Sequence, residues 1–421
     1  MKLLLRQVRI VDAYSPHNGQ TLDIFIENGI IKQTGDNLNI TADEVIDIKG
    51  LHVSPGWMDV FADFGDPGFE FKETLKSGAN AAAAGGYTDV MILPNTNPVL
   101  HNRSNIEYVI QKAGSLPVTI HPIGAITKNT EGKELAEMYD MQSGGAIAFS
   151  DGINTVQSAG VLVKALQYIK SFDGTIIQVP DDKSVNPYGL MNEGIVSTRL
   201  GLQGKPAMGE ELIIQRDLKL AGYAGSRIHF TGLSSKMSLE YIRKAKEEGI
   251  QVTCSVTPYH LFFCDEDLNS YDTNLKVNPP LRTAEDRDAL RQGIIDGTID
   301  CIASHHLPHE YDSKIVEFEY AKNGMISLET AFAALQTSLP TITLDKWIEL
   351  LSTNPARIFD RERQNIVADT LACLTLFDPG KIWKVTTDQI FSRSKNSPFL
   401  GKELTGKVIG IINKDQVFLN K

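Results

Sequence analysis

Residues 55–68 read PGWMDVFADFGDPG, and the rest of the chain is organised around this stretch. An apolar run leads into a Pro-Gly turn signal, a short strand-like segment follows, and a second Pro-Gly pair breaks it. Two aspartates, Asp59 and Asp63, stand within the strand-like segment. The stretch therefore predicts a short strand that carries carboxylates and ends at a sharp break.

Length, composition and charge bound the class of protein. A chain of 421 residues suits one large barrel with a small accessory domain, or two to three ordinary domains. Its 42% hydrophobic and 22% charged residues are typical of a soluble globular protein. A formal net charge of -11 disfavours both a general nucleic-acid binder and an anionic membrane surface as partner. We therefore expect neither nucleic acid nor a membrane as partner.

The cysteines and the N-terminus indicate a cytoplasmic protein. The cysteines have no CxxC spacing, and we expect buried free thiols in a reducing compartment. The apolar run at residues 1–6 is too short for a signal peptide, and no stretch approaches the roughly 20 apolar residues of a membrane span. The predicted location is the cytoplasm.

Both ends of the chain read as short strands. Alternating residues predict strands at 3–11 and 22–32, with a hairpin turn at Asn28-Gly29, and a third strand at 44–48. The C-terminal part predicts strands at 374–378, 383–385 and 407–413. Neither end can bury a two-sided sheet alone. We therefore expect residues 1–54 and 360–421 to combine into one β-sandwich domain.

The middle of the chain, residues 55–359, alternates between strands and helices. Apolar runs at 87–93, 118–123, 146–149, 175–179, 227–231, 251–256 and 300–304 predict strands, and helical segments lie between them. Eight such units close into a (β/α)8 TIM barrel, although the periodicity alone also fits an open doubly wound sheet. In either α/β fold, ligands bind at the C-terminal ends of the strands.

A family resemblance covers almost the whole chain. The frame at 55–68 resembles the signature of the cyclic amidohydrolases, and among them the dihydroorotases, which read P-G-x-x-D-x-H-x-H-x-R-E-P-G. Further dihydroorotase-like motifs follow in the family's order: KE at 72–73, SG at 77–78, AAAGGYT at 82–88, LPNTNP at 93–98, AFSDG at 148–152, NPPLR at 278–282, GTID at 297–300, PH at 308–309 with Lys314, TNPAR at 353–357, NSPF at 396–399 and LTGKV at 404–408. The resemblance implies an amidohydrolase-type barrel.

The resemblance also implies a chemistry that depends on metal. Dihydroorotases close carbamoyl-aspartate to dihydroorotate in pyrimidine biosynthesis, and reopen the ring. An amide carbonyl is a poor electrophile and water a poor nucleophile, so the relatives use zinc to polarise the first and activate the second. Such a site needs several histidine and carboxylate ligands and an aspartate as general base.

Most of the implied ligand positions are replaced in this chain. Phe61 and Asp63 stand at the positions of the first two histidines, and Val179 and Gly232 at those of the two later ones. His305 stands at the position of the catalytic aspartate. Phe and Val cannot bind metal, and Gly has no side chain. The sequence therefore predicts that the metal site is lost and that no cofactor is required.

Some positions leave alternatives open. Asp151 remains as a plausible ligand, and Asp63, Asp151, His305 and His309 together could rebuild a weak zinc site. Gly65 replaces an arginine that would bind the substrate carboxylate. No catalytic residue is assigned with this pattern.

The implied substrate-binding positions match the family more often than the implied metal-ligand positions do. Asn95, Asn278 and His309 match positions that resemble dihydroorotate-binding residues. Each also has a structural interpretation: a turn residue for Asn95, a cap before Pro-Pro for Asn278 and a structural histidine for His309. The pairs His305-His306 and Asp181-Asp182 are interpreted as a core or solvated pair and as a solvated loop, respectively.

Three functional hypotheses follow. In the first, the chain is an inactive dihydroorotase-like protein that serves as a structural partner of aspartate carbamoyltransferase, as the resemblance implies. In the second, it is an active cyclic amidohydrolase with a rebuilt zinc site. In the third, it is a small-molecule binding protein that keeps the old pocket. Whether the chain is an enzyme is left open, and the resemblance implies a homo-oligomer.

Overall fold

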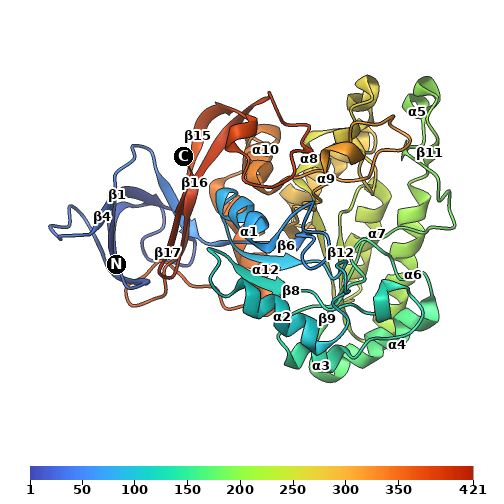
Figure 1. Ribbon diagram of the computed structural model, residues 1–421, viewed down its shortest axis with the longest axis horizontal. Helices are drawn as coiled ribbons and strands as arrows, with labels where there is room; N and C mark the ends of the chain where they lie inside the picture. The colour runs from blue at the N-terminus through green and yellow to red at the C-terminus, as the bar shows by residue number, and fades with distance from the viewer. Residues whose placement is uncertain (421) are drawn as a thin grey trace.

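The computed structural model describes residues 1–420 and contains a parallel barrel joined to a β domain (Figure 1). The barrel strands are arranged in two runs of parallel neighbours, one of three strands and one of four. They are β6 (Trp57–Ala62), β7 (Tyr87–Ile92), β8 (Thr119–Pro122), β9 (Thr175–Gln178), β12 (Arg227–Thr231), β13 (Val252–Val256) and β14 (Cys301–Ile302).

Single parallel bridges join these runs into a closed ring. Phe149 bridges Gly124 on one side and Ile176 on the other, so its segment takes the fourth position between β8 and β9. Ala62 bridges His306, which joins β6 to the end of β14. The predicted eightfold barrel is therefore confirmed and the open sheet is excluded. The strand predicted at 146–149 is wrong as a regular strand, because only single bridges pair it.

Helices lie around the ring of strands (Figure 1). The longer ones are α1 (Leu75–Ala84), α2 (Arg103–Ala113), α4 (Ala159–Ile169), α6 (Met208–Ala224), α7 (Lys236–Glu247), α9 (Ala284–Asp296) and α10 (Ala331–Ser338). Short helices are α3 (Met138–Ser143), α5 (Ile195–Leu200), α8 (Pro258–Phe262), α11 (Leu344–Ile348) and α12 (Asn354–Ile358). Among residues 1–420, no helix combines the length and the apolar character that crossing a membrane requires.

Helix α1 shows how the local sequence sets these elements. Thr74 caps its first turn by accepting a hydrogen bond from the amide of Ser77, and the Ser77 hydroxyl accepts from the Thr74 amide. Its buried alanines allow the helix to approach the barrel closely, and Gly85 ends it. The Leu75 amide at the start of the helix donates to Asp66 at 3.2 Å, which ties the helix to the loop that precedes it.

The two ends of the chain share one sheet at the left of Figure 1. Its order is β17-β16-β15-β5-β1-β2-β3, with β4 also on β1. The strands are β1 (Lys2–Ile10), β2 (Thr21–Glu27), β3 (Ile30–Gly35), β4 (Glu44–Ile46), β5 (His52–Pro55), β15 (Cys373–Lys384), β16 (Glu403–Asn413) and β17 (Gln416–Leu419). The predicted turn at Asn28 and Gly29 is present, and both residues have positive φ.

Strand β5 connects the N-terminal and C-terminal halves of this sheet. It runs parallel to β1 and antiparallel to β15, where Leu374 lies opposite Pro55. Side chains from both halves, such as Leu5, Ile24 and Leu376, form one buried cluster. The composite β domain is therefore built from both termini, and its strands form one continuous hydrogen-bonded sheet around a shared core.

Candidate functional site

A pocket of about 150 Å³ lies at the C-terminal ends of the barrel strands. Five of the positions singled out from the sequence line it: Phe61, Val179, Asn278, His305 and His306. Phe61 comes from the end of β6, Val179 follows β9 and His305 follows β14. The remaining wall is largely apolar and includes Leu93, Ile153, Tyr259, Val277 and Leu307. The barrel mouth is therefore hollow but poor in metal donors.

The His305 ring lies against Phe61 and Gly232, neither of which has a metal-binding side chain. Its ring stacks on Phe61, with centroids 4.4 Å apart and planes at 30°. A Cβ atom on Gly232 would lie 2.5 Å from Cε1 of His305, closer than real contacts allow. The imidazole therefore occupies the space that a side chain at position 232 would need.

The His305 ring is held by the barrel interior. Its Nε2 lies 2.8 Å from the Thr231 hydroxyl at the end of β12. Burial, with the nearby His260 and His229, lowers the pKa of His305 to about 3. The ring is therefore neutral at ordinary pH and a weak base, which does not suit the role of general base at the position of the family's aspartate.

Asp63 and Asp151 are both buried, and each makes local hydrogen bonds. The Asp63 carboxylate accepts from the Gly65 amide at 2.8 Å. Asp151 accepts from the amide and the hydroxyl of Thr127, at 2.9 and 2.5 Å. Burial raises the pKa of Asp63, and it raises the pKa of Asp151 to about 6 despite the Thr127 hydrogen bonds. Neither residue lines the pocket.

Two of the implied substrate-binding residues serve the surrounding backbone. The Asn95 amide donates to the Asp151 carbonyl at 3.1 Å, and its oxygen accepts from the Ile153 amide at 3.1 Å. His309 lies outside the pocket beside a separate groove, and its Nε2 is 2.8 Å from the Asn323 carbonyl. The structural interpretations of Asn95 and His309 thus describe their contacts.

Asn278 belongs to a charged cluster that the sequence did not reveal. Its oxygen accepts from Lys205 Nζ at 2.8 Å, and its amide donates to Asp181 at 3.1 Å. Lys205 and Asp181 form an ion pair at 2.7 Å. The interpretation of Asp181 as part of a solvated loop is wrong, because this carboxylate is buried between Lys205 and Asn278. Lys205 lies 24 positions further along the chain, so no local signal marks the pair.

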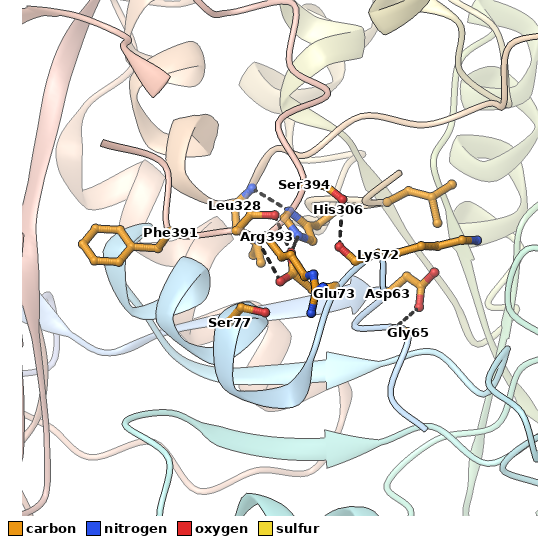
Figure 2. A network of polar contacts seen from close by, with 12 residues as sticks. Asp63, Gly65, Lys72, Glu73, Ser77, His306, Leu328, Phe391, Arg393 and Ser394 are labelled. Atoms are coloured by element: carbon orange, nitrogen blue, oxygen red, sulfur yellow. Dashed lines mark hydrogen bonds and ion pairs between the residues drawn. The ribbon is translucent and has the colours of Figure 1, made fainter. Parts of the chain in front are cut away.

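His306 and Glu73 form a second buried group, which Figure 2 shows next to the mouth of the barrel. His306 Nε2 lies 3.5 Å from a Glu73 oxygen, and Nδ1 accepts from the Ser327 amide at 3.2 Å. Glu73 also accepts from the Ser392 hydroxyl and, at 3.0 Å, from the Arg393 amide. Burial raises the pKa of Glu73, but the His306 ring first, and then the Ser392 and Ser77 hydroxyls, outweigh burial and leave the pKa lowered. The interpretation of His306 as a core residue agrees with these contacts.

The residues of the mouth do not fit a zinc ion. Zinc needs three or four nitrogen, sulfur or carboxylate ligands that converge on one point. In the described part of the chain, no three His, Cys, Asp or Glu side chains converge in this way. Asp63, Asp151, His305 and His309 would each have to leave a present partner to do so. We therefore derive no chemical step through a metal.

The sequence of this chain is similar to one family model and to named proteins from other organisms. The family model described as Dihydro-orotase-like matches residues 50–238. A protein named dihydroorotase from Syntrophus aciditrophicus (strain SB) is 40% identical over 414 residues, which are 97% of each chain. One from Carboxydothermus hydrogenoformans is 42% identical over 389 residues, covering 91% of this chain and 90% of the other.

Solved structures with the same architecture are more distant in sequence. The L-hydantoinase (dihydropyrimidinase) from Arthrobacter aurescens superposes with a TM-score of 0.87 at 24% identity, covering all of this chain and 96% of the other. The dihydropyrimidinase from Brevibacillus agri gives a TM-score of 0.84 at 20% identity, covering 100% and 95% of the two chains. At these identities the likeness establishes a shared fold of barrel and β domain.

Proposed function

This chain belongs to the dihydroorotase family of amidohydrolases, and from that premise we propose that it acts in pyrimidine biosynthesis without catalysing the dihydroorotase reaction. Its role is that of a structural partner of aspartate carbamoyltransferase. The observation that carries the proposal is the replacement of donors at the barrel mouth by Phe61, Val179 and Gly232, with His305 in the space beside them.

The chemistry of ring opening explains why this replacement matters. Dihydroorotate is a cyclic amide that resists neutral water, and a metal ion supplies both carbonyl polarisation and a nucleophile at neutral pH. Among residues 1–420 no three metal-binding side chains converge at the mouth, and His305 is a weak base. Gly65 adds a second loss, because no arginine stands there to hold the substrate carboxylate. Binding and activation of carbamoyl-aspartate are both unsupported by the side chains present.

The first experiment tests catalysis and metal together. The chain is purified from zinc-supplemented medium, its metal content is measured, and ring opening of dihydroorotate is followed. We expect sub-stoichiometric zinc and no turnover above buffer. Stoichiometric zinc with turnover would overturn the proposal.

A second candidate, an active dihydroorotase with a rebuilt zinc site, is favoured by the identity of about 40% to proteins that carry that name. Its site would use Asp151, so Asp151→Asn would abolish zinc binding and turnover, whereas Asp312→Asn, at an exposed position, would leave them unchanged. Under the main proposal neither variant differs from the parent in zinc content or in turnover.

The third experiment tests the partner. The full chain is mixed with aspartate carbamoyltransferase from the same organism and analysed by sedimentation velocity. We expect a joint boundary at micromolar concentrations and a change in transferase activity on mixing. Independent sedimentation of the two proteins, with unchanged transferase kinetics, would refute the structural role. Thermal stabilisation by dihydroorotate alone would favour a small-molecule binding protein instead.

A further inference from the structure

The pocket at the barrel mouth has an aromatic and aliphatic lining without free charge. Among the described residues that line it, none is Lys, Arg, Asp or Glu. Lys205 and Asp181, which contact the pocket-lining Asn278, neutralise one another at 2.7 Å. The Asn278 amide group is used by the same two side chains. A charged ligand would therefore lose its hydration here and gain no opposite charge.

His305 presents a polar ring atom to the pocket, which Asn323 also lines. Its Nε2 is bonded to Thr231, whereas its Nδ1 has no hydrogen-bond partner among residues 1–420. This unpaired Nδ1 is not fully buried. It is therefore reached from the pocket that His305 lines. Whether this nitrogen donates or accepts depends on the tautomer, which the opposite ring nitrogen fixes.

A chain of hydrogen bonds through the barrel interior sets that tautomer. Ser255 Oγ donates to Thr231 Oγ1 at 2.8 Å, so the Thr231 hydrogen is free to donate to His305 Nε2 at 2.8 Å. His229 Nε2 lies 3.0 Å from Ser255 Oγ and its Nδ1 lies 2.8 Å from Thr253 Oγ1, which fits the same direction. With Nε2 as acceptor, the neutral ring carries its proton on Nδ1, and this N–H donates into the pocket.

We propose that the barrel mouth binds a small, flat, uncharged ring that carries a carbonyl oxygen, and that it discriminates against the same ring bearing a carboxylate. The ring packs among Phe61, Val179 and Leu307, and its carbonyl accepts from His305 Nδ1–H. This is a change of ligand class from the carboxylate substrate of the family. It goes beyond the proposed function and does not depend on the transferase partner.

A matched pair of probes tests the inference on the unmodified full-length chain. Uracil and orotate share one planar ring with carbonyls and differ by a carboxylate. Isothermal titration calorimetry and thermal shift should show uracil binding at least about tenfold more tightly than orotate. Equal or tighter binding of orotate, or no binding of either compound at millimolar concentration, would overturn the inference.

Two variants test the donor. His305→Phe keeps a ring on Phe61 and removes the N–H, and Thr231→Val removes the hydroxyl that fixes the tautomer. Both should weaken uracil binding by about tenfold. Thr88→Val is the matched control, because Thr88 is also a buried strand threonine with hydrogen bonds, yet it does not line this pocket. Unchanged uracil affinity in both Thr231→Val and His305→Phe would contradict the inference.

Nitrogen-15 spectra of histidine give a readout independent of folding yield. We expect His305 as the Nδ1–H tautomer in the parent chain, and a mixture of tautomers in Thr231→Val. A parent ring protonated on Nε2 would overturn the assigned donor. Repeating the titrations with zinc separates the two proposals: orotate binding that appears only with zinc refutes the non-catalytic function, whereas failure of uracil binding with and without zinc refutes only the ligand class.

Discussion

Gly232 and His305 are complementary in shape: a Cβ atom at 232 would lie 2.5 Å from Cε1 and 3.1 Å from Nε2 of the imidazole. Both residues also have positive φ, +74° at Gly232 and +46° at His305. The two positions are therefore coupled. A side chain cannot return to position 232 while the ring of His305 stays in place.

Replacing this glycine should destabilise the chain more than its backbone angle alone requires. Gly232→Ala adds both the left-handed strain and the overlap with His305, and we expect a loss of about 3 kcal/mol in the free energy of unfolding. Gly201→Ala is the control, because Gly201 has φ +67° and nothing within 4 Å of its Cβ position. It should lose only about 1 kcal/mol. Urea denaturation measures both, and equal losses would contradict the coupling.

The buried carboxylate of Glu73 should be important for attaching the 391–394 segment to the barrel (Figure 2). Glu73→Gln weakens the bonds from Ser392 and Arg393 and removes the charge facing His306, and we expect a loss of about 2–3 kcal/mol near neutral pH. Because the pKa of Glu73 is lowered from 4.5, this contribution is lost as the pH falls through the folded pKa. The difference from the parent should therefore shrink in acid.

Its control is Glu285→Gln, which breaks an exposed ion pair with Lys236 and should leave the denaturation midpoint unchanged. Equal effects of the two substitutions would show that burial of Glu73 contributes little.

The free energy of unfolding should decrease as the pH falls below 6.5, the ordinary pKa of histidine. Burial lowers the pKa of His229 and His305 to about 3, and that of His260 and His309 to about 4. The unfolded chain therefore binds more protons between about pH 6.5 and 4, and stability falls as the pH falls through this window. Urea midpoints measured from neutral pH down to about pH 5 test this.

Buried carboxyls whose pKa is raised oppose this trend. Burial raises the pKa of Asp59, Asp151 and Asp217 from 3.8 to about 6, so the folded state binds more protons there and gains stability as the pH falls from about 6. The pKa values of the four histidines lie further from their ordinary value than those of these three aspartates, and net acid destabilisation is expected. His305→Phe should show a shallower loss than the parent between neutral pH and about pH 5. A steeper loss in this variant would refute the assignment.

Asn95 should stabilise the loop after Phe149 whether or not a ligand is present. Asn95→Ala removes the bonds to the Asp151 carbonyl and the Ile153 amide, and a loss of about 1–2 kcal/mol is expected. Limited proteolysis at residues 150–155 and urea denaturation measure it. Unchanged stability, with a loss only of ligand binding, would assign Asn95 to recognition instead.

The fold followed from the sequence because periodicity and turn chemistry are local. The Asn28-Gly29 turn and the strands at 87–92 and 227–231 were readable from neighbouring residues alone. The segment at 146–149 differs from the predicted strand, because its residues are apolar like those of a buried strand while only single bridges pair its backbone. Whether an apolar run forms a ladder depends on neighbours that the run itself does not encode.

The sequence shows which family positions carry other residues at the site. It does not predict how those side chains are arranged in space. Sequence placed Phe61 and His305 at former ligand positions, yet their stacking joins residues 244 positions apart and requires the positive φ of His305. The alternation of Thr231 with His229, and of Ser255 with Thr253, was the available signal for polar side chains on one face of β12 and β13. The ion pair of Asp181 and Lys205 had no comparable signal, since it depends on loop conformation.

Strand β5 has a consequence for how the protein is made. It pairs with β1, already synthesised, and with β15, which leaves the ribosome some 320 residues later: Leu374 lies opposite Pro55. One edge of β5 therefore stays open throughout translation of the barrel, as an adhesive edge that other nascent chains can join. A messenger that ends before codon 373 would release a polypeptide with that edge permanently uncovered, and we expect such a product to go to inclusion bodies or proteolysis.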